Sequence, residues 1–182
     1  PVTFGSLTRR KLPGQWREFY DIIEERNRGG ARIFTQVHSR EINSILSFET
    51  STPFDNWDVW RDVRKLPLEG QMAAMRDPET KAKLVEIASR PYEGPVIAGA
   101  EAQPPEWDIF YEIDKVALPH PSMADIAKQR GVSPAEAMID IALESNLKKF
   151  FRQPLANENM DDALALMRHP DSCVTFSDSG AH

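Results

Sequence analysis

The sequence predicts a mixed α/β fold in which helices outnumber strands. Two observations carry this prediction: one helix-to-strand junction lies near residue 30, and another lies near residue 172. A helix followed directly by a strand is half of a β-α-β unit, the usual building block of parallel sheets. With 182 residues and 41% hydrophobic content, the chain is long enough for one domain with a real core.

The first junction is predicted from the pattern of the N-terminal part of the chain. Residues 2–4 are short and β-prone, and a helix is predicted over about residues 15–27. The apolar residues of this helix repeat at helical spacing and form one stripe: Trp16, Phe19, Tyr20 and Ile23. The glycine pair at 29–30 ends the helix, and residues 31–38 follow as a strand.

The middle of the chain predicts helices separated by prolines. Residues 55–90 are helix-rich, and Asp77 followed by Pro78 is typical of a helix start. Residues 107–113 predict a short strand. The tryptophan-rich stretch at 57–60 and the aromatic residues at 107–111 are interpreted as core or subunit packing.

The second junction is predicted from the C-terminal part. A capping box at Ser133–Glu136 opens a helix predicted to run to about residue 151. A further helix over 159–168 leads to a final strand at 173–178. Cys173, inside this strand, is interpreted as a small core residue.

Composition excludes several classes of protein. A formal charge of −6 argues against a general nucleic-acid binder, which needs a basic face. No apolar run approaches the roughly 20 residues of a membrane helix, and no signal peptide is visible. One cysteine cannot form an internal disulfide. We therefore expect a cytoplasmic protein with neither a nucleic-acid nor a membrane partner.

Polar residues at strand ends are the candidates for chemistry, since the four histidines have no metal-binding spacing. Asp178 ends the apolar face of the last strand, where barrel enzymes place catalytic groups; the alternative is a turn-forming aspartate before Ser-Gly. Gln36, His38 and Arg40 share one face of the strand at 31–40. Arg40 suits a substrate carboxylate, and the alternative is a solvated strand exit.

A series of motifs in the second half of the chain resembles a known family. The series is Ser-Met-Ala-Asp-Ile-Ala at 122–127, Gly-Val-Ser-Pro-Ala-Glu-Ala at 131–137, Ile-Asp-Ile-Ala-Leu-Glu at 139–144, His169-Pro170 and Ser-Asp-Ser-Gly-Ala-His at 177–182. In this order they resemble the later part of the N-acyl-D-amino-acid deacylases of the amidohydrolase superfamily. The segment at 30–37 is similar to the seventh barrel strand of that family.

The resemblance implies the late strands of a (β/α)8 TIM barrel, as one α/β segment over 1–182 with a helix-rich insertion at about 50–120. It implies a zinc-dependent hydrolase that cleaves an amide C–N bond, plausibly in an N-acyl amino acid. Asp178 matches the general base of the family, with Gln36, His38, Arg40 and His182 as substrate contacts. The zinc ligands would lie mostly outside this chain.

The resemblance also implies that the chain is a fragment. We expect it to be inactive alone, and to self-associate or to pair with the rest of the barrel. Two other hypotheses stay open: a non-catalytic interaction or structural module, and an inactive amidohydrolase homologue.

Overall fold

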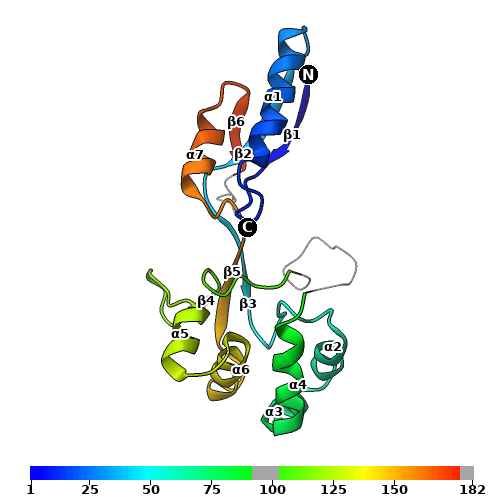
Figure 1. Cartoon of the computed structure of the whole chain (residues 1–182), viewed down its shortest axis with the longest axis vertical. Coiled ribbons are helices and arrows are strands. Elements are labelled where there is room, and N and C mark those ends of the chain that lie inside the picture. The colour runs from blue at the N-terminus through cyan, green and yellow to red at the C-terminus, as the bar shows by residue number, and fades with distance from the viewer. Residues whose placement is uncertain (92–102, 177–182) are drawn as a thin grey trace. The chain divides into compact units, whose positions relative to one another are not determined.

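The computed structural model describes residues 1–91 and 103–176, and the chain divides into two compact units (Figure 1). Unit 1 consists of Pro1–Asn43 and Pro154–His182, and unit 2 consists of Ser44–Gln153. The chain therefore leaves unit 1 once, builds unit 2 from one continuous stretch, and returns. The predicted insertion at about 50–120 falls inside unit 2, and the predicted single segment over 1–182 stays a prediction.

Unit 1 contains a three-stranded parallel sheet with two helices. Its elements are β1 (Val2–Ser6), α1 (Gln15–Arg28), β2 (Ile33–His38), α7 (Met160–Arg168) and β6 (Ser172–Phe176). The strand order is β1-β2-β6, so β2 is central and pairs in parallel with both neighbours. Both helices pack against β2. They lie beside each other on one face of the sheet, because Trp16 and Arg17 of α1 bond Asp162 of α7.

Helix α1 confirms most of its predicted apolar stripe. Trp16, Tyr20 and Ile23 are buried against the sheet, but Phe19 is 51% exposed, so its predicted burial is wrong. Phe19 lies on the flank of the helix, one position outside the inward face. The helix ends at the predicted glycine pair, where Gly30 takes a φ of 94° that favours glycine.

Three hydroxyl groups meet in the core of unit 1. The Tyr20 hydroxyl lies 2.5 Å from Thr35 Oγ1 and 2.6 Å from Ser172 Oγ, and these two oxygens are 3.1 Å apart. The contact joins α1, β2 and β6. Tyr20 and Thr35 are almost fully buried, and a buried hydroxyl is costly unless it is hydrogen-bonded. The triad therefore satisfies its own polar groups while it fixes the helix on two strands.

Unit 2 is built from the elements between the two parts of unit 1. They are β3 (Ile42–Leu46), α2 (Asp58–Arg64), α3 (Leu68–Arg76), α4 (Pro78–Ala88), β4 (Tyr111–Ile113), α5 (Met123–Arg130), α6 (Pro134–Glu144) and β5 (Phe150–Ala156). The bounds of β3 and β5 include the residues where the chain passes between the units. These strands form a second sheet of order β3-β5-β4, in which β4 and β5 are antiparallel.

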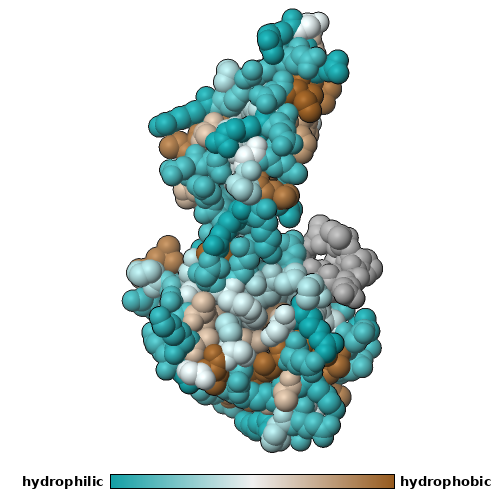
Figure 2. Space-filling view, in the orientation of Figure 1, coloured by the Kyte–Doolittle hydropathy of each residue, from teal (hydrophilic) through white to brown (hydrophobic). Residues whose placement is uncertain are grey.

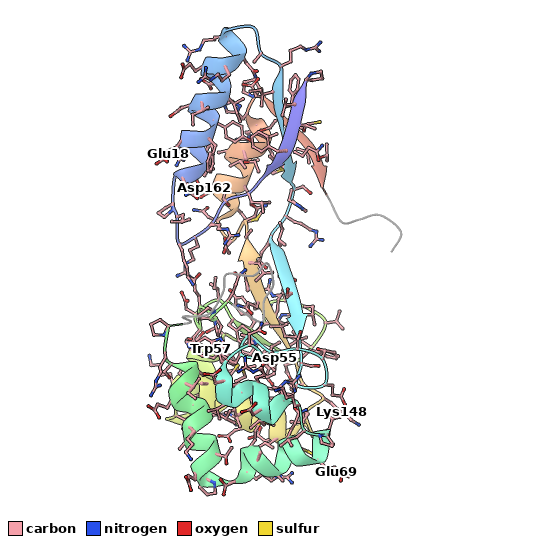
Figure 3. All side chains as sticks on the ribbon, turned by 90° about the vertical axis from the view of Figure 1, so that its right-hand side faces the viewer. Glu18, Asp55, Trp57, Glu69, Lys148 and Asp162 are labelled. Carbon is pink, nitrogen blue, oxygen red and sulfur yellow. The ribbon has the colours of Figure 1, made fainter. Side chains whose placement is uncertain are left out.

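An aromatic cluster forms the core of unit 2. The ring of Phe54 lies 5.5 Å from that of Trp57 and 4.7 Å from that of Trp60. Trp60 is fully buried, and its Nε1 donates to the Leu84 carbonyl at 2.9 Å. The interpretation of the 57–60 stretch as packing residues is confirmed; Trp57 lies at the start of α2 (Figure 3).

Arg64 anchors the loop that precedes α2. Its Nε donates to Asp55 Oδ1 at 2.9 Å, its Nη2 donates to the Thr50 carbonyl at 3.1 Å, and its Nη1 donates to the Phe48 carbonyl. The Arg64 side chain is only 10% exposed. A mostly buried guanidinium is tolerated here because one carboxylate and two backbone carbonyls accept hydrogen bonds from it.

The predicted helix starts are confirmed by their caps, whereas two predicted bounds are wrong. Asp77 accepts from the Thr80 N–H at 2.8 Å, and Ser133 accepts from the Glu136 N–H at 3.2 Å. Helix α6 ends at Glu144 rather than near residue 151, because Asn146 and Leu147 take positive φ angles of 50° and 66°. The strand predicted at 107–113 is limited to Tyr111–Ile113.

The predicted partial TIM barrel is wrong. A barrel is one closed parallel sheet, whereas the described strands form two separate three-stranded sheets, one of which contains an antiparallel pair. Cys173 is also not a core residue: it is exposed, because β6 is an edge strand and Cys173 faces away from the helices. None of the helices within 1–91 and 103–176 is long and apolar enough to span a membrane.

A salt bridge links β4 to the residue just before β5. Lys149 Nζ lies 2.8 Å from Glu112 Oε1 and 3.7 Å from Asp114 Oδ1. The hydrogen bond that Lys149 donates to Glu112 raises the pKa of the Lys149 ammonium above its ordinary value of 10.5, against the opposing effect of burial. Since the folded pKa exceeds the unfolded one, the stabilisation is complete below pH 10.5 and is lost as the pH rises through the folded pKa.

We expect Lys149→Met to destabilise unit 2 by about 0.5–1 kcal/mol near neutral pH, and the difference from wild type to shrink as the pH rises through the raised pKa of Lys149. Urea unfolding followed by tryptophan fluorescence measures this, because Trp57, Trp60 and Trp107 all lie in unit 2. Lys148→Met, at the exposed neighbouring lysine, is the matched control. A difference that stays constant while the Lys149 ammonium loses its proton would contradict the assignment.

Candidate functional site

Four cations follow the strands of the parallel sheet of unit 1. Arg9, Arg10 and Lys11 come after β1, and Arg40 comes after β2; all four are exposed. The carboxyl ends of parallel strands lie at the same edge of a sheet, where open α/β folds place their ligands. We call these four residues the basic edge.

Asn157 holds the two loops of the basic edge together. Its Oδ1 accepts from the Thr8 N–H at 2.9 Å and from the Thr8 hydroxyl at 3.3 Å, and its N–H donates to the Thr8 carbonyl at 2.9 Å. On the other side, its Nδ2 donates to the Arg40 carbonyl at 3.2 Å. Asn157 is 2% exposed and has a φ of 57°. The clamp reaches Thr8 through its backbone and its hydroxyl, and Arg40 through its backbone carbonyl.

The N-terminal part of unit 1 is locally basic, although Glu41 follows Arg40 directly. Residues 1–40 carry eight Lys or Arg and four Asp or Glu, and no acidic residue precedes Glu18. Residues 44–153 carry thirteen Lys or Arg and eighteen Asp or Glu. Salt screens charges beyond about 8–10 Å, so a ligand at the basic edge responds to nearby cations more than to the charge of the whole chain. Glu158 is a nearby carboxylate, whose Oε2 accepts from the Arg10 N–H at 3.2 Å.

The two described helices of unit 1 both lie on one face of β2, and we call its other face the open face. Thr35 and Val37 face the helices and are buried, whereas Phe34 faces the other way and is 39% exposed. Gln36 and His38 share the face of Phe34 and are half-buried. Strand β2 therefore leads from an exposed aromatic ring, past two polar side chains, to Arg40 of the basic edge.

The structure places three of the five predicted site residues in one region. Gln36 and His38 share the open face, and Arg40 follows at the strand exit as predicted. Arg40 Nη1 donates to the Glu41 carbonyl at 3.4 Å. The other two, Asp178 and His182, lie outside the described residues. The catalytic and substrate-binding roles assigned to all five stay predictions.

Two features of this region were missed by the sequence analysis. The three consecutive cations Arg9, Arg10 and Lys11 are visible in the sequence. They were not taken as a possible nucleic-acid contact, because the net charge of −6 sums the charges of both units. Asn157 carries no local signal, since its partner Thr8 is 149 residues away in the sequence.

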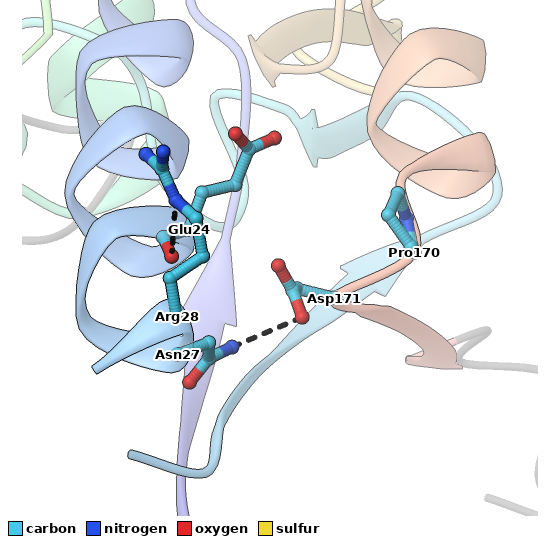
Figure 4. A pocket seen from close by; sticks show the side chains of 5 residues that line it. All are labelled: Glu24, Asn27, Arg28, Pro170 and Asp171. Carbon is cyan, nitrogen blue, oxygen red and sulfur yellow. Dashed lines mark hydrogen bonds between the residues drawn. The ribbon is translucent and has the colours of Figure 1, made fainter. Parts of the chain in front are cut away.

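A hollow in unit 1 lies between the C-terminal end of α1 and the start of β6. It is lined by Glu24, Asn27, Arg28, Pro170 and Asp171 (Figure 4). Its polar groups bond one another: Asn27 Nδ2 donates to Asp171 Oδ1 at 3.0 Å, and Asn27 also exchanges two hydrogen bonds with the backbone of Ile33. We therefore interpret the residues around the hollow as structural contacts that hold α1, β2 and the start of β6 together.

Metal binding has no support among the described residues. No group of three or more His, Cys, Asp or Glu side chains in that part of the chain is arranged to hold a metal ion. The predicted zinc was expected to have most of its ligands outside this chain, so zinc binding stays a prediction.

The comparisons with known proteins point away from a hydrolase. Over 153 residues, the chain is 26% identical to the telomere-binding protein 51 kDa subunit of Euplotes crassus. The alignment takes in 83% of this chain and 34% of the relative, so the chain spans about a third of the relative's length. No protein-family model matches the chain, and no solved structure matches it.

These findings correct the predicted family, function and partners. The resemblance to N-acyl-D-amino-acid deacylases is wrong, because no amidohydrolase family model matches and the relative is a telomere-binding subunit. Metal-dependent hydrolysis of an N-acyl amino acid is therefore wrong as the function. The exclusion of nucleic acid as a partner is wrong for the same reason. The alternative of a non-catalytic interaction module fits the relative better.

The clamp makes a direct prediction. We expect Asn157→Gly, which tolerates the positive φ but removes the side chain, to destabilise unit 1 by about 1–3 kcal/mol, because the buried groups it bonded lose their partner. Amide hydrogen exchange at residues 7–12 and 39–41 measures the loosening, with the amides of α4 as an internal control. Asn157→Asp keeps the acceptor for Thr8 and loses the donor to Arg40, so its effect should concentrate at 39–41. Equal exchange in wild type and Asn157→Gly would contradict the clamp.

Proposed function

We propose that this chain is a non-catalytic nucleic-acid-binding module and that telomeric DNA is its ligand. The observation that carries the proposal is its similarity, over 83% of its length, to a telomere-binding subunit. The basic edge supports it with a local cationic surface on an otherwise acidic chain. The proposal concerns only the part of the relative that this chain spans.

The basic edge supplies the phosphate contacts in this proposal. Nucleic-acid affinity comes largely from Lys and Arg that neutralise backbone phosphates and release counterions. Arg9, Arg10 and Lys11 on one loop and Arg40 on the next offer such cations at one edge of the sheet. Because Asn157 holds both loops through backbone groups, these cations are partly pre-positioned before a ligand arrives.

The open face supplies the base contacts. An exposed aromatic ring accepts a stacked base, and Phe34 has this exposure beside Gln36 and His38. The half-buried amide of Gln36 offers a donor and an acceptor for base edges, and the His38 imidazole, whose Nδ1 is buried, adds its ring beside them. The predicted ligand-contact roles of Gln36, His38 and Arg40 are thus kept, with DNA in place of an N-acyl amino acid.

A DNA ligand also bears on location. The proposed function requires that the chain reach the compartment that holds the chromosome ends. The predicted cytoplasmic location goes beyond the finding that no described helix is suited to span a membrane, and it remains untested.

We expect the triple variant Arg9→Ala, Arg10→Ala, Lys11→Ala to weaken binding to telomeric-repeat DNA about tenfold or more. The slope of log K against log salt should fall by up to about 2–3, because up to three phosphate contacts are lost. Fluorescence anisotropy at several salt concentrations measures both quantities, on single-stranded and duplex DNA in parallel.

The control for this variant has the same net charge. Arg61→Ala, Lys65→Ala, Lys128→Ala removes three exposed cations of unit 2 and should leave the affinity and the salt slope nearly unchanged. Equal losses in the two triple variants would show that binding depends on overall charge and not on the basic edge. No binding by the wild-type chain to either form of DNA would overturn the proposed function.

We expect Phe34→Ala to weaken DNA binding by about 1–3 kcal/mol without changing the salt slope, since a stacked ring contacts a base and not a phosphate. Phe150→Ala is the matched control, because Phe150 is a comparably exposed phenylalanine on a strand of unit 2. An unchanged affinity of Phe34→Ala would remove the open face from the proposed interface and leave the basic edge alone.

A further inference from the structure

The outer edge of β1 offers unpaired backbone groups. β1 ends the strand order β1-β2-β6, and within the described part of the chain no strand pairs with its outer side. The Val2 N–H donates to the Arg32 carbonyl at 2.8 Å, so Val2 directs its backbone groups toward β2. Because these directions alternate along a strand, Thr3 and Gly5 direct their N–H and C=O groups outward. Such an edge is a template for pairing with another strand.

Exposed apolar side chains border this edge. Val2 and Phe4 of β1 are 60% and 44% exposed, and Phe19 and Ile22 of α1 are 51% and 54% exposed. We call these four residues the edge patch. Figure 2 shows hydrophobic side chains gathered over α1 and β1. Contiguous apolar surface of this kind marks interaction sites in soluble proteins.

The two halves of the edge patch lie on the same side of the sheet. Phe4 pairs with Thr35, whose side chain bonds Tyr20, so Phe4 points to the face that α1 covers. Arg17 and Glu24 of α1 bond residues on the α7 side. Phe19 lies on the opposite flank of the helix, at 100° per residue, which is the flank nearer to β1.

We propose that two copies of this chain associate through β1, as an antiparallel pair related by a two-fold axis at Phe4. Thr3 of one copy then faces Gly5 of the second copy, and each of these two pairs exchanges two hydrogen bonds. Phe4 meets its symmetry mate at the central position that makes no hydrogen bonds, where side chains approach most closely. This interaction goes beyond the proposed DNA binding and does not depend on it.

The flank of α1 is self-complementary under the same two-fold axis. Its side chains run Gln15, Phe19, Ile22, Arg26, a spacing of four, three and four that is the same in both directions. Two antiparallel copies therefore set Phe19 against Ile22, and Gln15 against Arg26. The apolar residues meet in the middle, and an amide oxygen faces each guanidinium. The midpoint of this stripe is next to Tyr20, at the level of the strand pair Phe4–Thr35.

The other way of extending the sheet is less favourable. If β1 of one copy paired in parallel with β6 of the next, α1 and α7 would lie side by side in the same direction. Both last turns carry an exposed arginine, Arg26 and Arg168, so two like charges would lie at the same end of this contact. This head-to-tail contact would also leave free edges and grow without closing, whereas the two-fold pairing ends at a dimer.

Sedimentation velocity of the full 182-residue chain tests the proposal, up to about 100 µM. The expected result is a concentration-dependent dimer of twice the 20.6 kDa chain mass. Phe4→Lys should raise the dimer dissociation constant at least about tenfold, because the charge would be buried beside its own mate. Thr3→Pro should do the same, because it removes an outward N–H that β1 does not use in the monomer. Circular dichroism checks that both variants fold.

Val174→Lys is the matched control, since Val174 of β6 is 50% exposed at the opposite edge of the sheet. It should leave the dimer intact. A chain that stays monomeric, or a dimer lost in Val174→Lys and kept in Phe4→Lys, would overturn the proposal.

A second measurement does not depend on weakening the dimer. In a Cys173→Ser background, Phe4→Cys should form a disulfide-linked dimer on mild oxidation, and Val2→Cys should form far less of it. Equal cross-linking at both positions would also overturn it.

Discussion

The three hydroxyl groups of Tyr20, Thr35 and Ser172 are the constraint on which the rest of unit 1 depends. They bring together α1, the central strand β2 and the last strand β6 within 3.1 Å of one another. They fix α1 on one face of β2, and Phe34 is exposed on the opposite face. Because they also fix the rotation of α1, Phe19 is turned toward β1. The open face and the edge patch are therefore both defined by the placement of α1 that this buried polar contact fixes, whereas the basic edge depends on Asn157.

Local patterns predicted the local structure well. The period of Trp16, Tyr20 and Ile23, and the capping residues Asp77 and Ser133, predicted helices whose starts the structure confirms, because these features depend on residues a few positions apart. The arrangement of the strands depends on pairs far apart in sequence, such as Gln36 with Cys173. The periodicity of a sequence does not reveal which distant strands pair. The strand arrangement was therefore inferred from a short series of motifs, and the inferred barrel was wrong.

The candidate site was half predicted, for a similar reason. Alternation along β2 was enough to place Gln36 and His38 on one face, with Arg40 at the strand exit. The run from Arg9 to Lys11 was visible but was outweighed by the net charge, a quantity that adds the acidic unit 2 to the basic start of unit 1. The position of Asn157 against Thr8 required the fold itself, since the backbone of the intervening 148 residues brings them together.

The insertion of unit 2 into unit 1 has a consequence for synthesis on the ribosome. Strand β2 is made before unit 2, but its neighbour β6 follows only after the whole of Ser44–Gln153 has been translated. Every residue of unit 2 thus leaves the ribosome before unit 1 can close its sheet, although unit 1 begins first. During this interval the hydroxyl groups of Tyr20 and Thr35 lack their partner Ser172. The apolar side chains of the nascent β1-α1-β2 segment are then exposed to solvent, because β6 and α7 have not yet been made. Chaperone binding during synthesis should therefore concentrate on residues 1–40 as numbered here.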